Sequence, residues 1–185
     1  MSRKSRGTPI IGIAGWKKSG KTTLVMRLIA ELTARGLRVA TVKHAHHDFQ
    51  IDDAETDSAR HRRAGASQVA IVSAKRWALV NELGGAPEPS FEDVVSRLEP
   101  CDLIIVEGYK SAPIPKIEVR RRETVRQTAL AGTDPNFIAI AADHPVDGHA
   151  LPVFSLDDIA GIADFLIAAV GVGDRQSRSS SSSTT

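Results

Sequence analysis

Eight residues near the start of the chain have the types and spacing of a phosphate-binding loop. The segment from Gly15 to Thr22 reads Gly-Trp-Lys-Lys-Ser-Gly-Lys-Thr and matches the pattern Gly-x4-Gly-Lys-Thr. In this pattern the glycines let successive backbone N–H groups converge on phosphate oxygens at the positive end of a helix. The lysine reaches the β- and γ-phosphates, and the threonine hydroxyl is a ligand of Mg2+. The segment therefore predicts binding of a nucleoside triphosphate together with magnesium.

The loop and the residue after it supply the predicted phosphate contacts. These are Gly15, Lys17, Lys18, Ser19, Gly20, Lys21, Thr22 and Thr23. Thr23 lies one residue further into the helix, near the expected place of the α-phosphate. The alternative is a glycine turn before a lysine-rich helix start. Cations at a helix N-terminus oppose its dipole unless an anion is present, which favours the phosphate site.

The residues around the loop form the strand, loop and helix that such a site needs. Residues 9–14 are a short apolar run, typical of a strand buried on both faces of a parallel sheet. From Lys21 onward, leucines at helical spacing form one stripe that ends at Gly36. Residues 37–42 predict a second strand, which completes a βαβ unit with a right-handed crossover.

The rest of the chain alternates in the same way. Further strands are expected at 68–72, 77–80, 102–106, 117–120, 137–141 and 153–155, and helices at 57–64, 91–98 and 157–170. This alternation predicts an α/β fold of the P-loop NTPase type, with a mostly parallel β-sheet flanked by helices.

The length of 185 residues fits one domain with a sizeable core. We expect a nucleotide-binding domain over residues 9–171, between disordered polar tails at residues 1–8 and 172–185. The formal net charge of +2 comes from basic residues in these tails. The charge of the body therefore gives no reason to expect a nucleic-acid partner.

Composition also bears on the compartment. Cys101 is the single cysteine, so it cannot form an internal disulfide, which fits a reducing environment. The sequence has no signal-peptide pattern and no run approaching the ~18 apolar residues that span a bilayer. We expect a cytoplasmic protein without membrane contact.

The carboxylate that would complete a magnesium site is predicted at Glu107. It ends the apolar run 103–106 and precedes Gly108, so it should lie at the carboxyl edge of the sheet, where ligands bind in open α/β folds. Asp102 begins the same run and should lie at the opposite edge. An ordinary solvated strand end is the alternative for Glu107.

A histidine-rich segment follows the second predicted strand and should emerge near the phosphates. Its residues are Lys43, His44, Ala45, His46, His47 and Asp48. A zinc site is disfavoured, because His47 points away from the other two in an extended segment and no cysteine or later histidine pair completes four ligands. The lysine and the imidazoles could contact phosphate or a bound partner, and Asp48 could reach the Mg2+ shell. A solvated polar loop remains the alternative for each.

Taken together, these segments resemble the molybdopterin-guanine dinucleotide biosynthesis adapter proteins, the MobB family. The resemblance rests on residues 15–23, 42–48, 76–79 and 103–110, and runs from about residue 10 to residue 170. It implies a GTP-binding homodimer that assists a separate guanylyltransferase in attaching GMP to molybdopterin. Its own GTP hydrolysis would be slow at most.

The resemblance also suggests residue roles. Asp143 follows the strand-like run 139–142, where its carboxylate could accept hydrogen bonds from N1 and N2 of guanine. The Asn-Lys-x-Asp signature of many GTPases is absent, so ATP remains open. Lys110 joins Lys43 and the histidines as a candidate contact to the partner or cofactor. The run 120–122, three arginines, is interpreted as a solvated strand end.

Two other functions remain open. A small-molecule kinase using ATP would need a base and an arginine-bearing lid, for which Asp48 and residues 60–63 are candidates. A module that has lost nucleotide binding is disfavoured by the intact Lys21 and Thr22. Arg76 and Trp77 are a candidate interface anchor, with core burial of the tryptophan as the alternative.

Overall fold

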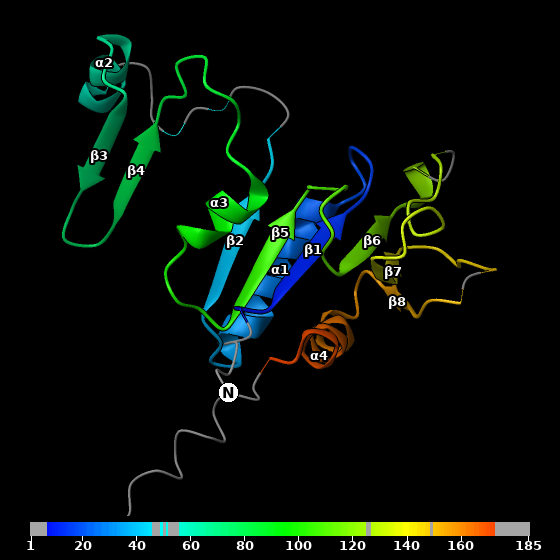
Figure 1. Cartoon of the computed structure of the whole chain (residues 1–185). Helices are drawn as coiled ribbons and strands as arrows, with labels where there is room; N and C mark the ends of the chain where they lie inside the picture. The colour runs from blue at the N-terminus through cyan, green and yellow to red at the C-terminus, as the bar shows by residue number, and fades with distance from the viewer. Residues whose placement is uncertain are drawn as a thin grey trace, which may run out of the picture. The chain divides into compact units, whose positions relative to one another are not determined.

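The computed structural model describes residues 7–45, 49, 51, 56–124, 127–148 and 150–172. Its elements in chain order (Figure 1) are β1 (Ile10–Ala14), α1 (Lys21–Ala34), β2 (Val39–Lys43), α2 (Asp57–Arg63), β3 (Gln68–Val72), β4 (Trp77–Asn81), α3 (Phe91–Ser96), β5 (Leu103–Glu107), β6 (Lys116–Arg120), a 3-10 turn (Arg122–Thr124), β7 (Phe137–Ala142), β8 (Val153–Ser155) and α4 (Ile159–Val170). Each predicted helix and strand is present, with its ends within two residues of the prediction.

Two compact units make up the chain, one from the residues up to His44 together with those from Arg97 onward, and one from Ala45 to Ser96. The sequence predicts a single domain over residues 9–171, whereas in the structure the segment 45–96 packs as a unit of its own. Most of the two predicted tails lies outside the described residues.

The larger unit is built on a six-stranded sheet in the order β2-β5-β1-β6-β7-β8 (Figure 1). All five neighbouring pairs are parallel. The predicted α/β fold with a mostly parallel sheet is therefore confirmed. Because β5 lies between β1 and β2, the strand that carries Glu107 is the direct neighbour of the strand that leads into the phosphate loop.

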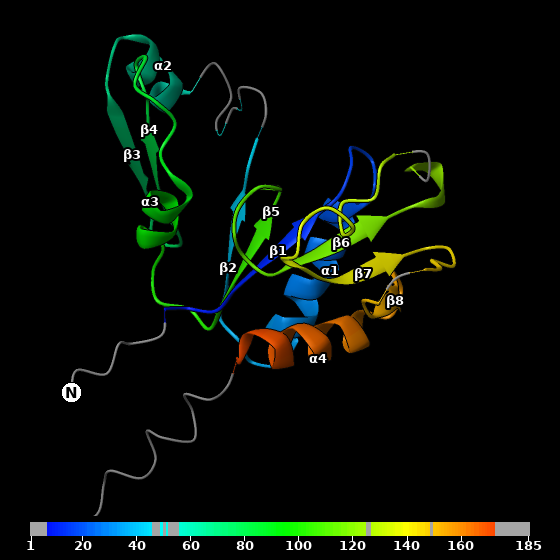
Figure 2. The ribbon, with the colours of Figure 1, turned by 45° about the vertical axis from the view of Figure 1, so that its right-hand side comes forward.

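One face of this sheet is covered by α1 and α4, which also pack against each other (Figure 2). Alternate strand residues such as Ile11, Ile105 and Ile117 meet the leucines of α1 in one apolar core. The helix α4 begins where the Asp158 carboxylate accepts a hydrogen bond from the amide of Gly161 at 3.0 Å. Aliphatic side chains therefore hold β1 and α1, the two elements on either side of the loop, in fixed positions.

A buried lysine lies on the opposite face of the sheet. Lys116 is fully buried, and its ammonium donates to the carbonyl oxygens of Lys110 and Ala112, each at 2.8 Å. The same Nζ pairs with Asp134 at 2.6 Å. A β-carbon on Gly12 would lie 2.7 Å from Cγ of Lys116, so the lysine stem fills the space that the glycine leaves open.

Replacing Asp134 with asparagine is expected to lower the free energy of unfolding by about 2 kcal/mol at neutral pH, because the buried ammonium of Lys116 loses its counter-charge. The hydrogen bond from Lys116 is the main cause that lowers the pKa of Asp134 below 3.8. A depressed pKa stabilises the fold above the unfolded value, and this contribution is lost as pH falls through the folded value. Urea titrations should therefore show the difference between wild type and variant shrinking below about pH 4.

Asp164→Asn is the control for this variant, because it breaks a surface ion pair between Asp164 and Arg35. The Asp164 side chain in this pair is 72% exposed. Exposed pairs contribute roughly 0 to 1 kcal/mol. Equal stability of Asp134→Asn and Asp164→Asn at pH 7 would show that the Lys116 charge does not need its partner.

The smaller unit consists of α2, the antiparallel hairpin of β3 and β4, and α3. The Thr56 hydroxyl begins α2 by accepting from the amide of Ala59 at 3.3 Å. Trp77 is 64% exposed, so the core-burial alternative for this residue is wrong within the single chain. Other large apolar side chains exposed on or beside the hairpin are Ile71, Val72, Leu79 and Leu83. No helix in the described part of the chain is long and apolar enough to cross a membrane.

Candidate functional site at the phosphate loop

The loop between β1 and α1 has a backbone that few residue types can adopt. Gly20, the last residue before α1, has a φ of 91°, and Lys18 has a φ of 65°. A β-carbon on Gly15 would lie 2.6 Å from both the Ser19 hydroxyl and the carbonyl oxygen of Val119. The two motif glycines are therefore required, one by the left-handed backbone and the other by the lack of space.

The N-terminus of α1 is left open for an anion. No side chain caps it, and its first turn contains no acidic residue. The first amides of a helix lack intrahelical acceptors, and together with the helix dipole they attract negative charge. Lys17 and Lys18 are exposed on the loop before it, whereas Ser19 is 1% exposed.

Lys21 is held back against the loop, where its Nζ donates to the carbonyl oxygen of Trp16 at 2.8 Å. Burial lowers the pKa of Lys21, Glu107 opposes this effect, and the positive charges of Lys110 and Lys43 add to the lowering. The site thus gathers more positive charge than Glu107 neutralises. A bound polyanion would restore the pKa and relieve this repulsion.

Thr22 and Glu107 are brought together as the sequence predicts. The Thr22 hydroxyl donates to Oε1 of Glu107 at 2.7 Å. This contact follows from the parallel pairing of β1 and β5, in which Ile13 lies opposite Glu107. Both side chains offer oxygen, the ligand type that Mg2+ prefers, and the Glu107 side chain is 11% exposed. The alternative of a solvated strand end for Glu107 is therefore wrong.

The described part of the histidine-rich segment also lies at this edge of the sheet. Lys43 pairs with Glu107, with 3.7 Å between Nζ and Oε1. The amide of His44 donates to the carbonyl oxygen of Glu107 at 3.0 Å. The centroid of the His44 ring lies 4.5 Å from the centroid of the Tyr109 ring. The predictions for His46, His47 and Asp48 concern residues outside the described part of the chain. Within the described residues, no group of three or more His, Cys, Asp or Glu is placed to hold a metal.

Lys110, three residues after the end of β5, lies against the loop. Its Nζ is 4.0 Å from the ring centroid of Trp16, a cation–π contact. Asp102 lies at the opposite end of β5, where it accepts from the amide of Arg38 at 2.7 Å. The predicted separation of Asp102 from the site is thereby confirmed.

Two adjoining hollows open beside the loop. The first, of about 290 Å3, is lined by Lys18, Gly20, Lys21, Thr22, Thr23 and Arg121. The second, of about 180 Å3, is lined by Gly20, Thr23, Leu24, Arg27, Arg121, Asp143, Leu156 and Asp157. We name them after the predicted contacts that line them: the phosphate hollow, with Lys21 and Thr22, and the base hollow, with Asp143. Gly20, Thr23 and Arg121 line both, so the two hollows adjoin at these residues.

Asp143, the predicted base-reading residue, is fixed in the base hollow. Its Oδ1 accepts from the amide of Arg122 at 2.8 Å and contacts Nδ1 of His144 at 3.0 Å. The hydrogen bond with His144 is the main cause that lowers the pKa of Asp143, so the carboxylate is ionised at neutral pH. Both of its hydrogen bonds to described residues use Oδ1, which leaves Oδ2 available to accept from a ligand.

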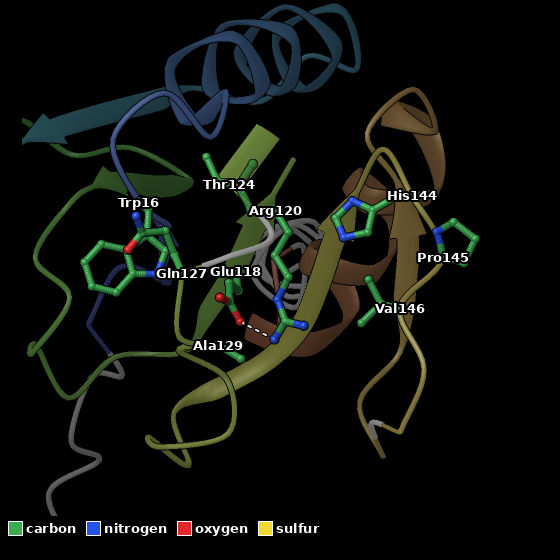
Figure 3. A pocket seen from close by; sticks show the side chains of 10 residues that line it. Trp16, Glu118, Arg120, Thr124, Gln127, Ala129, His144, Pro145 and Val146 are labelled. Carbon is green, nitrogen blue, oxygen red and sulfur yellow. Dashed lines mark hydrogen bonds and ion pairs between the residues drawn. The ribbon is translucent and has the colours of Figure 1, made fainter. Parts of the chain in front are cut away.

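A third cavity, of about 220 Å3, lies between Trp16 and His144 (Figure 3). Its lining includes the ion pair of Arg120 with Glu118, whose atoms are 2.7 Å apart. Glu118 is buried and also accepts from the amides of Leu130 and Ala131, each at 2.9 Å. This carboxylate therefore holds the connection between β6 and β7 over the sheet.

The interpretation of residues 120–122 as a solvated strand end is wrong for two of its three arginines. The Arg120 side chain is 16% exposed and paired, and Arg121 lines both hollows. Arg122 is exposed, as expected. The available signal was a cluster of cations at the carboxyl end of a strand, the edge at which the loop also lies.

Comparison with known proteins gives one consistent family. The family model described as molybdopterin guanine dinucleotide synthesis protein B, MobB, matches residues 10–143. The molybdopterin-guanine dinucleotide biosynthesis adapter protein of Haemophilus influenzae is 38% identical over 161 residues, covering 85% of this chain and 87% of that protein. The Escherichia coli protein of the same name is 37% identical over 161 residues, covering 86% and 91%.

A solved structure agrees. The crystal structure of a molybdopterin-guanine biosynthesis protein B is similar with a TM-score of 0.66 and 29% identity, covering 88% of this chain and 99% of that one. The chain therefore belongs to the family of molybdopterin guanine dinucleotide synthesis protein B, MobB.

Proposed function

We propose that this protein is a GTP-binding adapter in molybdenum cofactor biosynthesis, which assists a guanylyltransferase in attaching GMP to molybdopterin. The observation that carries the nucleotide part is the open N-terminus of α1 beside Lys21, with Thr22 2.7 Å from Glu107. The pathway rests on the names of the relatives, which are adapter proteins of molybdopterin-guanine dinucleotide biosynthesis.

In this proposal the loop amides and Lys21 bind the triphosphate in the phosphate hollow. Thr22 and Glu107 would hold Mg2+, with Asp48 as a further candidate. The ion would neutralise charge on the β- and γ-phosphates. The lining of the phosphate hollow contains no carboxylate or histidine among the described residues. None of the described residues that line this hollow can therefore act as a base toward water, and we propose slow hydrolysis at most, as the family resemblance implies.

Assembly with other proteins has support from two surfaces. The exposed apolar side chains of the hairpin, with Trp77 among them, are suited to a second copy of the chain, because such side chains gain by burial. We therefore propose a homodimer. Lys43, His44 and Lys110 lie at the edge of the phosphate loop, where a partner enzyme or the anionic molybdopterin would reach the nucleotide.

Asp143 should give the site its preference for guanine. Its carboxylate can accept from the N1 and N2 donors of guanine, whereas N1 of adenine is an acceptor and would repel it. Replacing Asp143 with asparagine is therefore expected to weaken GTP binding about 10-fold, and to leave ATP binding as strong as in wild type or stronger. Isothermal titration with both nucleotides in the presence of Mg2+ measures this. Asp147→Asn, at an exposed position nearby, is the control.

The proposal as a whole is tested by titrating the protein with GTP, ATP and CTP, with and without Mg2+, and by co-purification with the molybdopterin-loaded guanylyltransferase. Sedimentation of the same sample gives the oligomeric state. Equal affinity for all three nucleotides would remove the base assignment. Rapid ATP consumption that rises with one added metabolite would identify a kinase instead. Absence of any nucleotide binding would leave an interaction module.

A further inference from the structure

We propose that Arg121 is a phosphate-binding residue of the nucleotide site, with its guanidinium on the α-phosphate. The inference rests on the proposed nucleotide binding and adds a residue that the loop motif does not contain. Arg121 lies just beyond β6, 100 residues along the chain from Lys21, and lines both the phosphate hollow and the base hollow. Thr23, where the α-phosphate is expected, lines the same two hollows.

The guanidinium lies directly over the last residue of the loop. A β-carbon on Gly20 would be 2.7 Å from Nε of Arg121 and 3.1 Å from its Nη2. Glycine is therefore needed at position 20 for two reasons. It adopts the left-handed backbone, and it leaves space for the Arg121 side chain. This contact places a cation at the N-terminus of α1, where the helix dipole disfavours positive charge unless an anion lies between them.

No residue that the structure describes accepts a hydrogen bond from the Arg121 side chain. Its Nε is buried and has no hydrogen-bond partner. Its side chain makes no hydrogen bond or ion pair to any residue in the described part of the chain. Its interaction with Asp143 is a charge–charge attraction without direct contact. A buried donor without an acceptor is costly, and a phosphate oxygen would supply the acceptor. A guanidinium fork matches two phosphate oxygens at once.

The backbone holds Arg121 in place from both sides. Its amide donates to the Thr124 hydroxyl at 3.2 Å, and its carbonyl oxygen accepts from the amide and hydroxyl of Thr124 at 2.8 and 2.9 Å. The following amide, of Arg122, donates to Asp143 at 2.8 Å. The same turn therefore positions the arginine and the candidate base-reading carboxylate.

The neighbouring arginines show that this arrangement is particular to Arg121. Arg120 points into the third cavity, where Glu118 neutralises its charge (Figure 3). Arg122 is exposed and contributes its backbone amide. Of the three, Arg121 alone combines contact with the loop and an unneutralised charge.

The experiment compares GTP, GDP and GMP binding by wild type, Arg121→Gln, Arg121→Lys and the control Arg122→Gln. We expect Arg121→Gln to weaken binding of all three nucleotides roughly 10- to 100-fold, because a charge-assisted hydrogen bond is lost. Arg121→Lys should lose less, because the charge stays while the fork is lost. Arg122→Gln should stay within about twofold of wild type. A loss restricted to GTP would place the contact on the γ-phosphate, and GMP binding left unchanged in Arg121→Gln would place it on the β-phosphate; either result overturns the assignment.

Thermal melting without nucleotide separates a ligand role from a structural one. Arg121→Gln should melt no lower than wild type, because it removes an unsatisfied donor. A lower melting temperature of Arg121→Gln with unchanged nucleotide affinity would make Arg121 a structural residue and overturn the inference. If Arg121→Gln does not fold, the nucleotide affinities of Arg121→Lys decide. If Arg121→Gln binds nucleotide as tightly as wild type, this inference is overturned but the proposed function is not. If the wild-type protein binds no nucleotide, the proposed function itself is overturned.

Discussion

Replacing Lys21 with alanine is expected to weaken GTP binding by about 100-fold or more. Lys21 lines the phosphate hollow, and its ammonium group donates a hydrogen bond of 2.8 Å to the carbonyl oxygen of Trp16 in the loop. Binding a triphosphate would replace that neutral acceptor with charged oxygens, and charge-assisted hydrogen bonds are about twice as strong as neutral ones. Isothermal titration at constant Mg2+ measures the loss.

The free protein should not suffer from this change. Burial lowers the pKa of Lys21, so the charged form is destabilised in the free fold, and alanine removes that penalty. The melting temperature of Lys21→Ala without nucleotide should therefore equal or exceed that of wild type. Lys75→Ala, at an exposed position in the smaller unit, is the matched control for both measurements. Unchanged GTP affinity in Lys21→Ala would show that the loop does not bind the phosphates.

Replacing Glu107 with glutamine is expected to remove the dependence of GTP binding on Mg2+. In wild type the carboxylate contacts the Thr22 hydroxyl at 2.7 Å, and the two oxygens together suit the ion. With EDTA the carboxylate has no metal to neutralise it and repels the phosphates, so the variant should then bind GTP about 10-fold more tightly than wild type. With Mg2+ present the order should reverse.

Two threonine variants sharpen this test. Thr22→Ser keeps the hydroxyl and should keep the Mg2+ dependence, whereas Thr22→Val keeps the shape and should lose it. Nucleotide titrations in Mg2+ and in EDTA give all the affinities on one scale. If Glu107→Gln retained the full Mg2+ effect, the ion would have to be held elsewhere, and Asp48 would become the first candidate.

Much of the fold could be predicted because its signals are local. The helix α1 follows from leucines at helical spacing between two glycines, and β5 from an unbroken apolar run. The site at Thr22 and Glu107 was predictable for a related reason. The carboxyl ends of parallel strands meet at one edge, so a polar residue after a buried strand lies near the loop that follows another such strand.

The residues missed were those whose surroundings are set by distant parts of the chain. Nothing in the sequence around Lys116 distinguishes it from an ordinary strand residue, yet it is fully buried. Its ammonium group is surrounded by Asp134 and by two carbonyl oxygens from the connection between β5 and β6. The sequence predicts a solvated Arg121, because runs of basic residues are usually exposed to solvent. The segment 45–96 contains predictable elements, but its separation as a unit depends on which contacts its elements make.

The sequence by itself determined the phosphate loop, the elements that carry it and the family resemblance, because each depends on neighbours along the chain or on a fixed spacing. Only the tertiary structure decided the order of the strands, and with it which side chains face the loop. Since β6 pairs with β1, the end of β6 brings Arg121 over Gly20, and since β7 follows β6, Asp143 reaches the base hollow. Pairing between distant strands is a property of the whole packed sheet, and no local pattern of residues encodes it.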